Sequence, residues 1–448
     1  MYSERLEKAF ESAGIGLGER FRLTSEGKVM EGMLMPRPDS GNPDIIIIKF
    51  DNGYNAGIKF TRETKLEKLE AAKAAAKQNS PSVHSRKFNH SLGKVELIYT
   101  GGTISSKIDY KTGGVYMLTK PEELLETVPE IAGIANLSLT NLMSIASEDM
   151  SYLEWQKIAK AAADSLNNGA RGIIITHGTD TMHYTSAALS FMLKDLRGPV
   201  VMVGSQRSSD RGSSDAFVNL ASAARMAAES DMAEVAVCMH ATSSDNHCNI
   251  MRGTKVRKMH TSRRDAFRAI NSKPIASVSY EGKIIYHADD YRKIPGTDEK
   301  TKLMAGFEPK TALIKVHPNS DPGILEYYQG KGYKGAIIEG TGLGHAPVST
   351  PHSDLNWIRY IKSAVDSGMI IGMTSQCING RVNDKVYRNL RMIKDAGAVF
   401  CEDMMPEVAY VKLGWLLGNY KKAEAEKLLP ENLTGEISAR SEADWFGD

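Results

Sequence analysis

"VELIYTGGTISS", residues 95–106, decides the fold of this chain. Its first half is a short, apolar, β-branched run, and its second half is a glycine-rich turn that ends in hydroxyl side chains. Runs of the same kind follow at 172–176 ("GIIIT"), 199–204 ("PVVMVG") and 235–239 ("VAVCM"). Strands that are apolar on both faces are typical of a buried parallel sheet.

Segments with a helical pattern lie between these strands, at 151–169 and 213–230. The alternation of strand and helix predicts a doubly wound α/β domain. A second set of apolar runs, with helical patterns at about 353–367 and 405–417, predicts a second, smaller α/β domain. Those runs lie at 311–316, 335–340, 369–374 and 397–401.

The rest of the chain has a different character. Residues 1–60 contain strand-like runs cut by turn residues, and Asp51-Asn52-Gly53 is a strong hairpin signal, so we expect a small β-rich domain, barrel-like or curled. Residues 61–93 are rich in Ala, Lys and Glu and then in turn formers, which is typical of a linker. The predicted domains are 1–60, the linker 61–93, the α/β domains 94–290 and 291–420 with a connection at 250–310, and a polar, partner-docking tail at 421–448.

Composition limits the class of protein. The chain has 448 residues and a formal net charge of only +2, which argues against a protein that wraps nucleic acid by bulk charge. No run approaches the roughly twenty apolar residues that span a membrane. The four cysteines are scattered without a CxxC pair, so we expect reduced thiols in a cytoplasmic protein and no zinc site.

Polar side chains follow two neighbouring strands of the predicted sheet. Gly101-Gly102-Thr103 follows the first, and His177-Gly178-Thr179-Asp180-Thr181 follows the second. The carboxyl ends of parallel strands meet at one edge, where ligands bind. A hydroxyl nucleophile with an assisting base and backbone donors is what carboxamide hydrolysis requires.

Simpler readings exist for both turns. Gly-Gly-Thr is also a common turn, and Thr181 is suitably placed to cap the next helix. His177 and His183 are six residues apart, which is poor metal-ligand spacing, so hydrogen-bonded structural histidines are the better interpretation and no metal site is predicted.

The two turns together resemble a known family. "TGGTI" (100–104) and "HGTDT" (177–181), at this spacing, are similar to the two signature threonine motifs of the bacterial-type L-asparaginase family. The resemblance covers about residues 94–420 and includes "SEDM" (147–150) and "GTGLGH" (340–345). It implies an asparaginase-like core of two α/β domains with parallel sheets.

The resemblance also implies roles for individual residues. Thr103 matches the first catalytic threonine, and Thr179 and Asp180 match the second threonine and its aspartate. Lys258 matches the catalytic lysine, because Phe267 follows it by nine positions, and Lys255 is the second candidate. Which threonine attacks first, and whether the lysine is a neutral base or a fixed charge, stay open.

Substrate-binding residues follow from the same resemblance. Ser147 and Glu148 fall where the family holds the α-carboxylate and α-ammonium groups of its amino-acid substrate. Tyr116 falls where a tyrosine covers the first threonine. Plain asparaginases often carry Gln in place of Glu148, and they begin near their first strand, whereas residues 1–93 precede it here.

The β-rich extension, linker, core and tail together resemble the D-subunit family of the archaeal glutamyl-tRNA(Gln) amidotransferase. That resemblance implies that this chain releases ammonia from glutamine. A partner E subunit would then use the ammonia, with ATP and Mg²⁺, to convert Glu-tRNA(Gln) to Gln-tRNA(Gln). The same resemblance also implies a homodimer through the core, tRNA bound mainly by the partner, and no cofactor in this chain. A free-standing L-asparaginase and a non-enzymatic amino-acid sensor are the alternatives.

Overall fold

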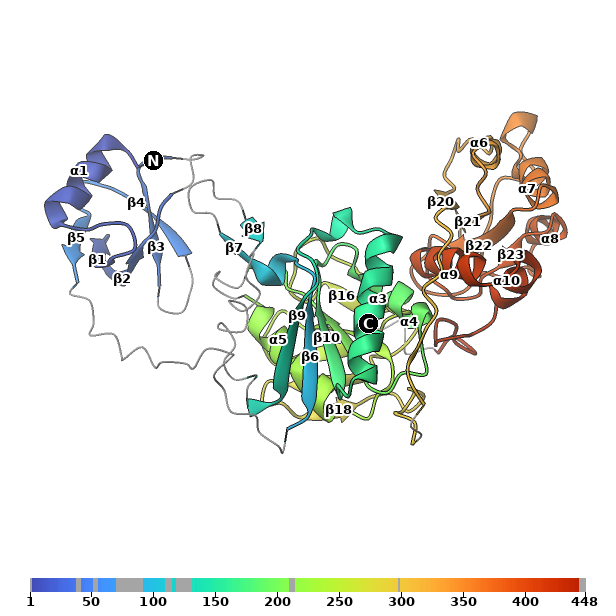
Figure 1. Ribbon diagram of the computed structural model, residues 1–448. Coiled ribbons are helices and arrows are strands. Elements are labelled where there is room, and N and C mark those ends of the chain that lie inside the picture. The colour runs from blue at the N-terminus through green and yellow to red at the C-terminus, as the bar shows by residue number, and fades with distance from the viewer. Residues whose placement is uncertain are drawn as a thin grey trace.

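The computed structural model describes the chain in three parts, which Figure 1 shows as a small N-terminal domain, a central α/β domain and a C-terminal α/β domain. The described residues are 2–37, 42–50, 55–69, 92–108, 115–117, 131, 133–208, 214–296 and 299–442.

The central domain is built on an eight-stranded sheet with the order β18-β17-β14-β13-β12-β10-β6-β9. The parallel strands are β6 (Lys94–Tyr99), β9 (Asn136–Asn141), β10 (Gly172–Thr176), β12 (Val200–Val203) and β13 (Val235–His240). The antiparallel strands are β14 (His247–Arg252), β17 (Ala276–Ser279) and β18 (Ile284–Tyr286). The predicted buried parallel strands are thus confirmed, within a mixed sheet.

Helices cover both faces of this sheet. On one face, α3 (Tyr152–Asn167) and α4 (Met182–Met192) pack with Ile173 and Ile175 of β10. On the other face, α5 (Ala216–Glu229) packs with Ile174. Consecutive isoleucines therefore pack into hydrophobic cores on opposite faces of the sheet. Both faces are buried, so the strand is apolar at every position instead of alternating.

The C-terminal domain has a four-stranded parallel sheet, β20-β21-β22-β23. Its α9 packs against α4 of the central domain, where Phe191 stacks on Trp415 with ring centroids 5.6 Å apart, so the two α/β domains share one core. The elements are β20 (Thr311–Lys315), α6 (Ile324–Gly330), β21 (Gly335–Gly340), η5 (Ser353–Leu355), α7 (Trp357–Asp366), β22 (Ile370–Ser375), α8 (Arg388–Asp395), β23 (Val399–Phe400), α9 (Pro406–Asn419) and α10 (Lys422–Leu428).

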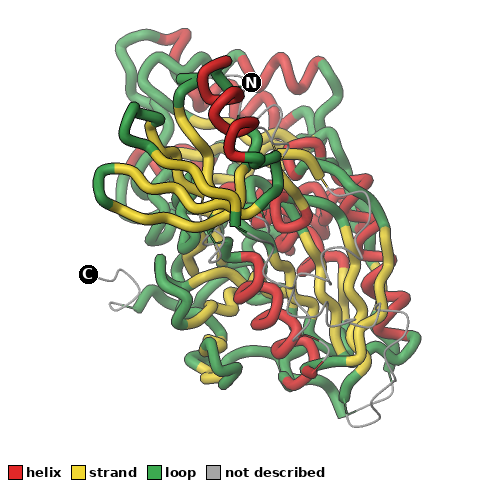
Figure 2. The backbone as a smooth tube through the Cα atoms, turned by 90° about the vertical axis from the view of Figure 1, so that its left-hand side faces the viewer, coloured by secondary structure: helices red, strands yellow, loops and turns green. Residues whose placement is uncertain are grey.

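The N-terminal domain packs α1 (Glu4–Ala13) on an antiparallel sheet, and Figure 2 shows this helix beside its strands, close to the N-terminus. Leu6 and Phe10 of the helix are buried against Phe21, Ile46 and other strand residues. The strands are β1 (Arg20–Ser25), β2 (Lys28–Leu34), β3 (Ile45–Lys49), β4 (Asn55–Lys59) and β5 (Lys65–Lys68). Their order is β4-β3-β2-β1-β5, which is open among the described strands, so a closed barrel is not confirmed.

The small N-terminal domain extends beyond its predicted end. The sequence predicts a linker from residue 61, but β5 pairs with β1, for example Leu66 with Leu23, so the small domain continues through Lys68. Residues 70–91 of the predicted linker lie outside the described residues. So does the predicted turn at 51–53, although the strands on either side of it pair antiparallel.

Two predictions for the C-terminal half are wrong. The stretch 250–310 is predicted to be a connection, but it contributes β17, β18 and part of β14 to the central sheet. The stretch 421–448 is predicted to be a polar tail, but its described part, up to residue 442, packs on the same chain, and docking on a partner stays a prediction. Leu429 is fully buried, and Glu436 forms a buried ion pair with Lys412 at 2.7 Å.

Short elements complete the architecture. The hairpin of β15 (Val256–Lys258) and β16 (Phe267–Ala269) lies between β14 and β17 in the chain and carries the predicted catalytic lysine. Two further pairs are β7 (Ser106–Ile108) with β8 (Val115–Met117), and β11 (Leu193–Lys194) with β19 (Lys302–Leu303). Among the described residues, no helix is both long and apolar enough to cross a membrane.

Candidate active site

The turn after β6 places Thr103. Gly101 and Gly102 both have positive φ, at 105° and 88°, and Thr103 begins the 3-10 helix η2 (Thr103–Ser105). A Cβ added to Gly102 would lie only 2.4 Å from the backbone nitrogen of Gly178. The two threonine motifs are therefore in backbone contact, and glycine is the residue that this contact and this φ allow.

The side chain of His177 holds the turn after β10 in place through two hydrogen bonds. The ring is fully buried, its Nδ1 donates to the Gly178 carbonyl at 2.6 Å, and its Nε2 accepts from the Thr185 hydroxyl at 2.9 Å. Burial lowers the pKa of His177 to about 4, so the ring is neutral near pH 7. This arrangement agrees with the interpretation of His177 as a structural histidine.

Lys258 joins the second motif from the opposite side. Its Nζ donates to the Thr179 hydroxyl at 2.9 Å and to the Asp180 carboxylate at 2.6 Å. The lysine is held by the hairpin, in which it lies opposite Phe267, a fully buried residue. Its side chain is 9% exposed, whereas that of Asp180 is 66% exposed, so the carboxylate lies at the mouth of the site.

The structure thus brings Thr179, Asp180 and Lys258 into one hydrogen-bonded group. Thr103 lies beside this group through the contact of Gly102 with Gly178, and it is partly exposed. A hydroxyl next to a lysine is the arrangement that activates a threonine or a water molecule.

The predicted substrate-binding residues lie on the neighbouring turn. Ser147 begins the 3-10 helix η4 (Ser147–Asp149), and its Oγ would lie 2.8 Å from a Cβ added to Gly178. The Thr181 hydroxyl donates to the Ser147 carbonyl at 2.6 Å instead of capping α4. Glu148 is exposed on the solvent side.

Tyr116 is placed only by its backbone. It lies in β8, paired with Lys107 of β7, close in the chain to Thr103. Its side chain lies outside what the structure describes, so the predicted cover over the first threonine stays a prediction.

Lys255 lies elsewhere. Its Nζ is 2.6 Å from the Asp403 carboxylate, and the two side chains are 2% and 0% exposed. An odd separation along an extended segment sends Lys255 and Lys258 to opposite sides. The second candidate for the catalytic lysine is therefore an internal ion-pair residue, away from Thr179.

Sequence reasoning missed a group behind the site. Arg257, next to Lys258, forms an ion pair with Glu407 at 2.8 Å, and His183 Nε2 lies 4.0 Å from the same carboxylate. Burial, with Arg257 and Lys258 nearby, lowers the pKa of His183 to about 4. The basic run "VRK" is visible in the sequence, but Glu407 is 150 positions away and carries no signal of its own.

Sequence profiles of known families match most of the chain. The family described as "Asparaginase, N-terminal" matches residues 94–292, "Glutaminase/Asparaginase C-terminal domain" matches 310–428, and "GatD N-terminal domain" matches 15–69. Proteins named as the D subunit of glutamyl-tRNA(Gln) amidotransferase are similar over their full length. Those of Thermococcus kodakarensis and Pyrococcus furiosus are 48% and 47% identical, with 99% of this chain and 99% of each relative covered.

Two solved structures resemble the core alone. The thermostable L-asparaginase from Thermococcus kodakarensis has a TM-score of 0.67 and 28% identity, and covers 78% of this chain and 100% of its own. L-asparaginase I from Vibrio cholerae has a TM-score of 0.66 and 28% identity, with coverage of 77% and 99%. The asparaginase-like core and the added N-terminal domain agree with the resemblance seen in the motifs: the chain belongs to the D-subunit family of glutamyl-tRNA(Gln) amidotransferases.

Proposed function

We propose that this chain is the glutaminase subunit of a tRNA-dependent amidotransferase. It hydrolyses the side-chain amide of glutamine and passes the ammonia to a partner E subunit, which converts Glu-tRNA(Gln) to Gln-tRNA(Gln) with ATP and Mg²⁺. The observation that carries the proposal is the Lys258 Nζ within hydrogen-bond distance of both Thr179 and Asp180, beside the turn that bears Thr103. The similarity to amidotransferase D subunits over 99% of the chain supports the division of labour.

The chemistry needs two half-reactions. In the first, the Thr103 hydroxyl adds to the amide carbon, its proton passes to the leaving nitrogen, and the carbon–nitrogen bond breaks to release ammonia. In the second, water adds to the resulting ester, and glutamate leaves as the Thr103 hydroxyl re-forms. Thr179, in contact with Lys258, orients and activates the attacking oxygen.

The substrate would be held by its α-groups. Asp180 and Glu148 are exposed carboxylates on neighbouring turns, which suits an α-ammonium group. Ser147 lies against Gly178 between them and is assigned to the α-carboxylate. Tyr116 is assigned to cover Thr103.

The same proposal covers the assembly. The partner E subunit binds most of the tRNA, which accords with the net charge of +2 on this chain, and the core forms a homodimer. No cofactor is assigned to this chain. A cytoplasmic location accords with four cysteines that are all free thiols.

The test is ammonia release from glutamine and from asparagine, measured with and without the partner complex and charged tRNA. Thr103→Ala and Lys258→Met should each lower glutamine turnover on the order of a thousandfold. Lys362→Met, an exposed lysine on α7, is the matched control and should keep full turnover. A Thr103→Ala variant that keeps a tenth of turnover would remove that residue as nucleophile, and asparagine as the sole substrate would favour a free-standing asparaginase.

A further inference from the structure

Strand β15 directs its side chains alternately to two neighbours. Val256 is buried in the shared core, and Lys258, on the same side of the strand, reaches the active-site group. Lys255 and Arg257 lie on the other side and reach the C-terminal domain. The strand that carries the catalytic lysine is therefore also a contact between the two α/β domains.

The contact consists of two ion pairs on one short segment. Lys255 binds Asp403 at 2.6 Å and Arg257 binds Glu407 at 2.8 Å, and both acidic residues are buried. They lie three residues before and one residue after Pro406, the first residue of α9. Buried ion pairs contribute little net stability because of the desolvation cost, but they fix position strongly when their geometry is good.

Further hydrogen bonds hold Asp403 itself. Its other carboxylate oxygen accepts the Ser438 backbone N–H at 3.0 Å, and its carbonyl accepts from the Asn271 side chain at 3.0 Å. Asn271 also accepts the Gly380 N–H at 2.9 Å, and it follows β16 after one residue. The hairpin, the start of α9 and the C-terminal segment thus converge on one carboxylate.

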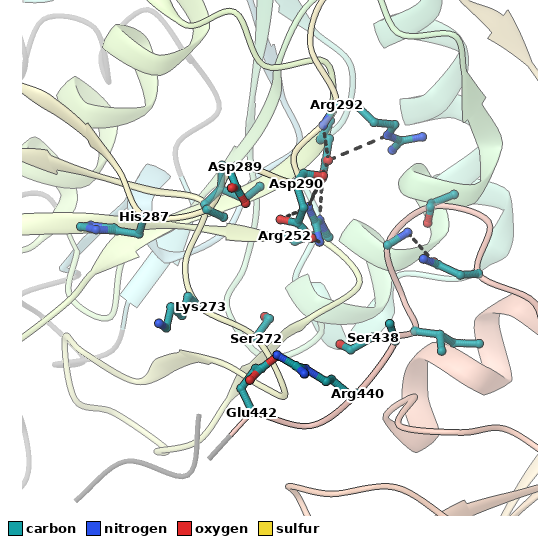
Figure 3. A pocket seen from close by; sticks show the side chains of 18 of the residues that line it. Arg252, Ser272, Lys273, His287, Asp289, Asp290, Arg292, Ser438, Arg440 and Glu442 are labelled. Atoms are coloured by element: carbon teal, nitrogen blue, oxygen red, sulfur yellow. Dashed lines mark hydrogen bonds and ion pairs between the residues drawn. The ribbon is translucent and has the colours of Figure 1, made fainter. Parts of the chain in front are cut away.

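A cavity of about 720 Å³ lies beside this C-terminal segment, where Figure 3 shows Ser438 and Arg440 on one side and Arg252 and Asp290 on another. Several of its charged groups are paired with one another: Arg252 binds Glu234 and Asp290, and Arg440 binds Glu442. We therefore build no proposal on this cavity.

We propose that Lys255 and Arg257 are positioning residues for glutamine hydrolysis. Their ion pairs with Asp403 and Glu407 hold β15 against the C-terminal domain and keep the Lys258 Nζ in reach of Thr179. This inference rests on the proposed function of Lys258. Its consequence is that the relative position of the two α/β domains sets the turnover of a site whose reacting groups lie in the central domain.

The experiment compares three double variants that each replace an ion pair by neutral side chains of similar size. Arg257→Met with Glu407→Gln, and Lys255→Met with Asp403→Asn, release β15. Lys412→Met with Glu436→Gln is the control for the loss of a buried ion pair: that pair is fully buried, at 2.7 Å, and its replacement leaves the Lys255–Asp403 and Arg257–Glu407 pairs in place. Using pairs avoids leaving one buried charge without its partner.

Both β15 variants should lower kcat for glutamine by about tenfold or more with KM changed less than about twofold, since misplacing a catalytic group by about 1 Å costs on this scale. The control should keep its kcat per folded molecule. Unchanged kcat in the Arg257 variant, or an equal loss in the control, would overturn the proposal. The Arg257 pair is the safer test for folding, because its arginine is already 25% exposed.

An activity-independent readout separates this proposal from the proposed function. The Met259 N–H donates to the Ala266 carbonyl at 2.7 Å and closes the hairpin, so its hydrogen exchange should accelerate in the β15 variants and not in the control. An active Lys258→Met variant would contradict the proposed function of Lys258. Unchanged hydrogen exchange in the β15 variants would instead contradict the proposal that the two ion pairs hold β15 in place.

Discussion

Single atoms at two glycines decide whether the two threonine motifs can meet. Gly102 lies against the His177–Gly178 backbone, and Gly178 lies against Ser147. Each contact is closer than any side chain would allow. The geometry of the proposed catalytic group therefore depends on the absence of a Cβ as much as on the presence of the hydroxyls.

Gly102→Ala should abolish most glutamine turnover, by about a hundredfold or more, and should destabilise the core. Gly169→Ala is the matched control, because its φ of 89° is nearly that of Gly102 but a Cβ there meets nothing within 4 Å. The control should lose about 1 kcal/mol from backbone strain alone and keep its turnover. The measurements are ammonia release from glutamine and urea unfolding of both variants. Equal effects would show that the positive φ of Gly102, and not its close contact with Gly178, explains the loss.

Burial of His177 predicts a dependence of stability on pH. Its pKa is about 4 in the folded chain and about 6.5 when unfolded, so between these values the unfolded state binds a proton that the folded state does not. The free energy of unfolding therefore falls as pH decreases from about 6.5 towards 4, and this contribution is constant above that range. Between pH 7 and 5.5 we expect a loss of about 1 kcal/mol from this residue.

Urea unfolding of the wild type and of His177→Gln at the two pH values measures this. The variant should lose about 1 kcal/mol less than the wild type, because its amide does not titrate. His183, with a pKa also near 4, remains in both proteins and cancels in the comparison. Parallel losses in the two proteins would contradict the burial argument.

At the scale of elements, strands that are apolar on both faces can be predicted from the sequence, whereas a strand of irregular polarity such as β14 cannot. The runs at β6, β10, β12 and β13 have few polar residues to obscure them. β14, "HCNIMR", mixes polar and apolar residues, and its sequence alone does not distinguish it from a connection. Its identity as a strand depends on pairing with β13 and β17, which is tertiary information.

The residues of the site also differ in how well the sequence predicts them. Thr179 and Asp180 are neighbours in the chain, so one motif reveals both. Lys258 needs the family resemblance, because "TKVRK" offers two lysines and the choice depends on which side of a strand each faces. Glu407 and Asp403 cannot be found from the sequence, since their partners are about 150 positions away.

The segment after residue 420 is predicted to be a tail, and its contribution to stability can be measured. Leu429 lies in the segment predicted to be a tail, but its side chain is fully buried in the core that the two α/β domains share. Leu429→Ala should lower the free energy of unfolding by about 2–5 kcal/mol. The control is Leu153→Ala on α3, where the side chain is 48% exposed, and it should lower the free energy of unfolding by less than about 1 kcal/mol. Urea midpoints of the two variants provide the measurement. Equal midpoints would mean that the segment is dispensable for folding after all.

At the scale of the whole molecule, the catalytic groups and the added parts are separate. The residues proposed to react lie within 94–292, which match the asparaginase-type N-terminal profile, and the small domain matches the "GatD N-terminal domain" profile at 15–69. L-asparaginase structures cover the core without that domain. The proposed hydrolytic site therefore lies in the part of the chain that L-asparaginases share.

If ammonia is the only product that the partner needs, free ammonium should replace this chain's chemistry but not its presence in the complex. A complex that carries Thr179→Ala should amidate glutamyl-tRNA with ammonium chloride at a rate close to that of the wild type. With glutamine as donor it should be slower on the order of a thousandfold, because the hydroxyl that Lys258 contacts is gone. The Lys362→Met complex is the control and should use both donors. Formation of glutaminyl-tRNA from each donor is the measurement, and failure with both donors would show that the threonine serves the assembly of the complex and not the release of ammonia.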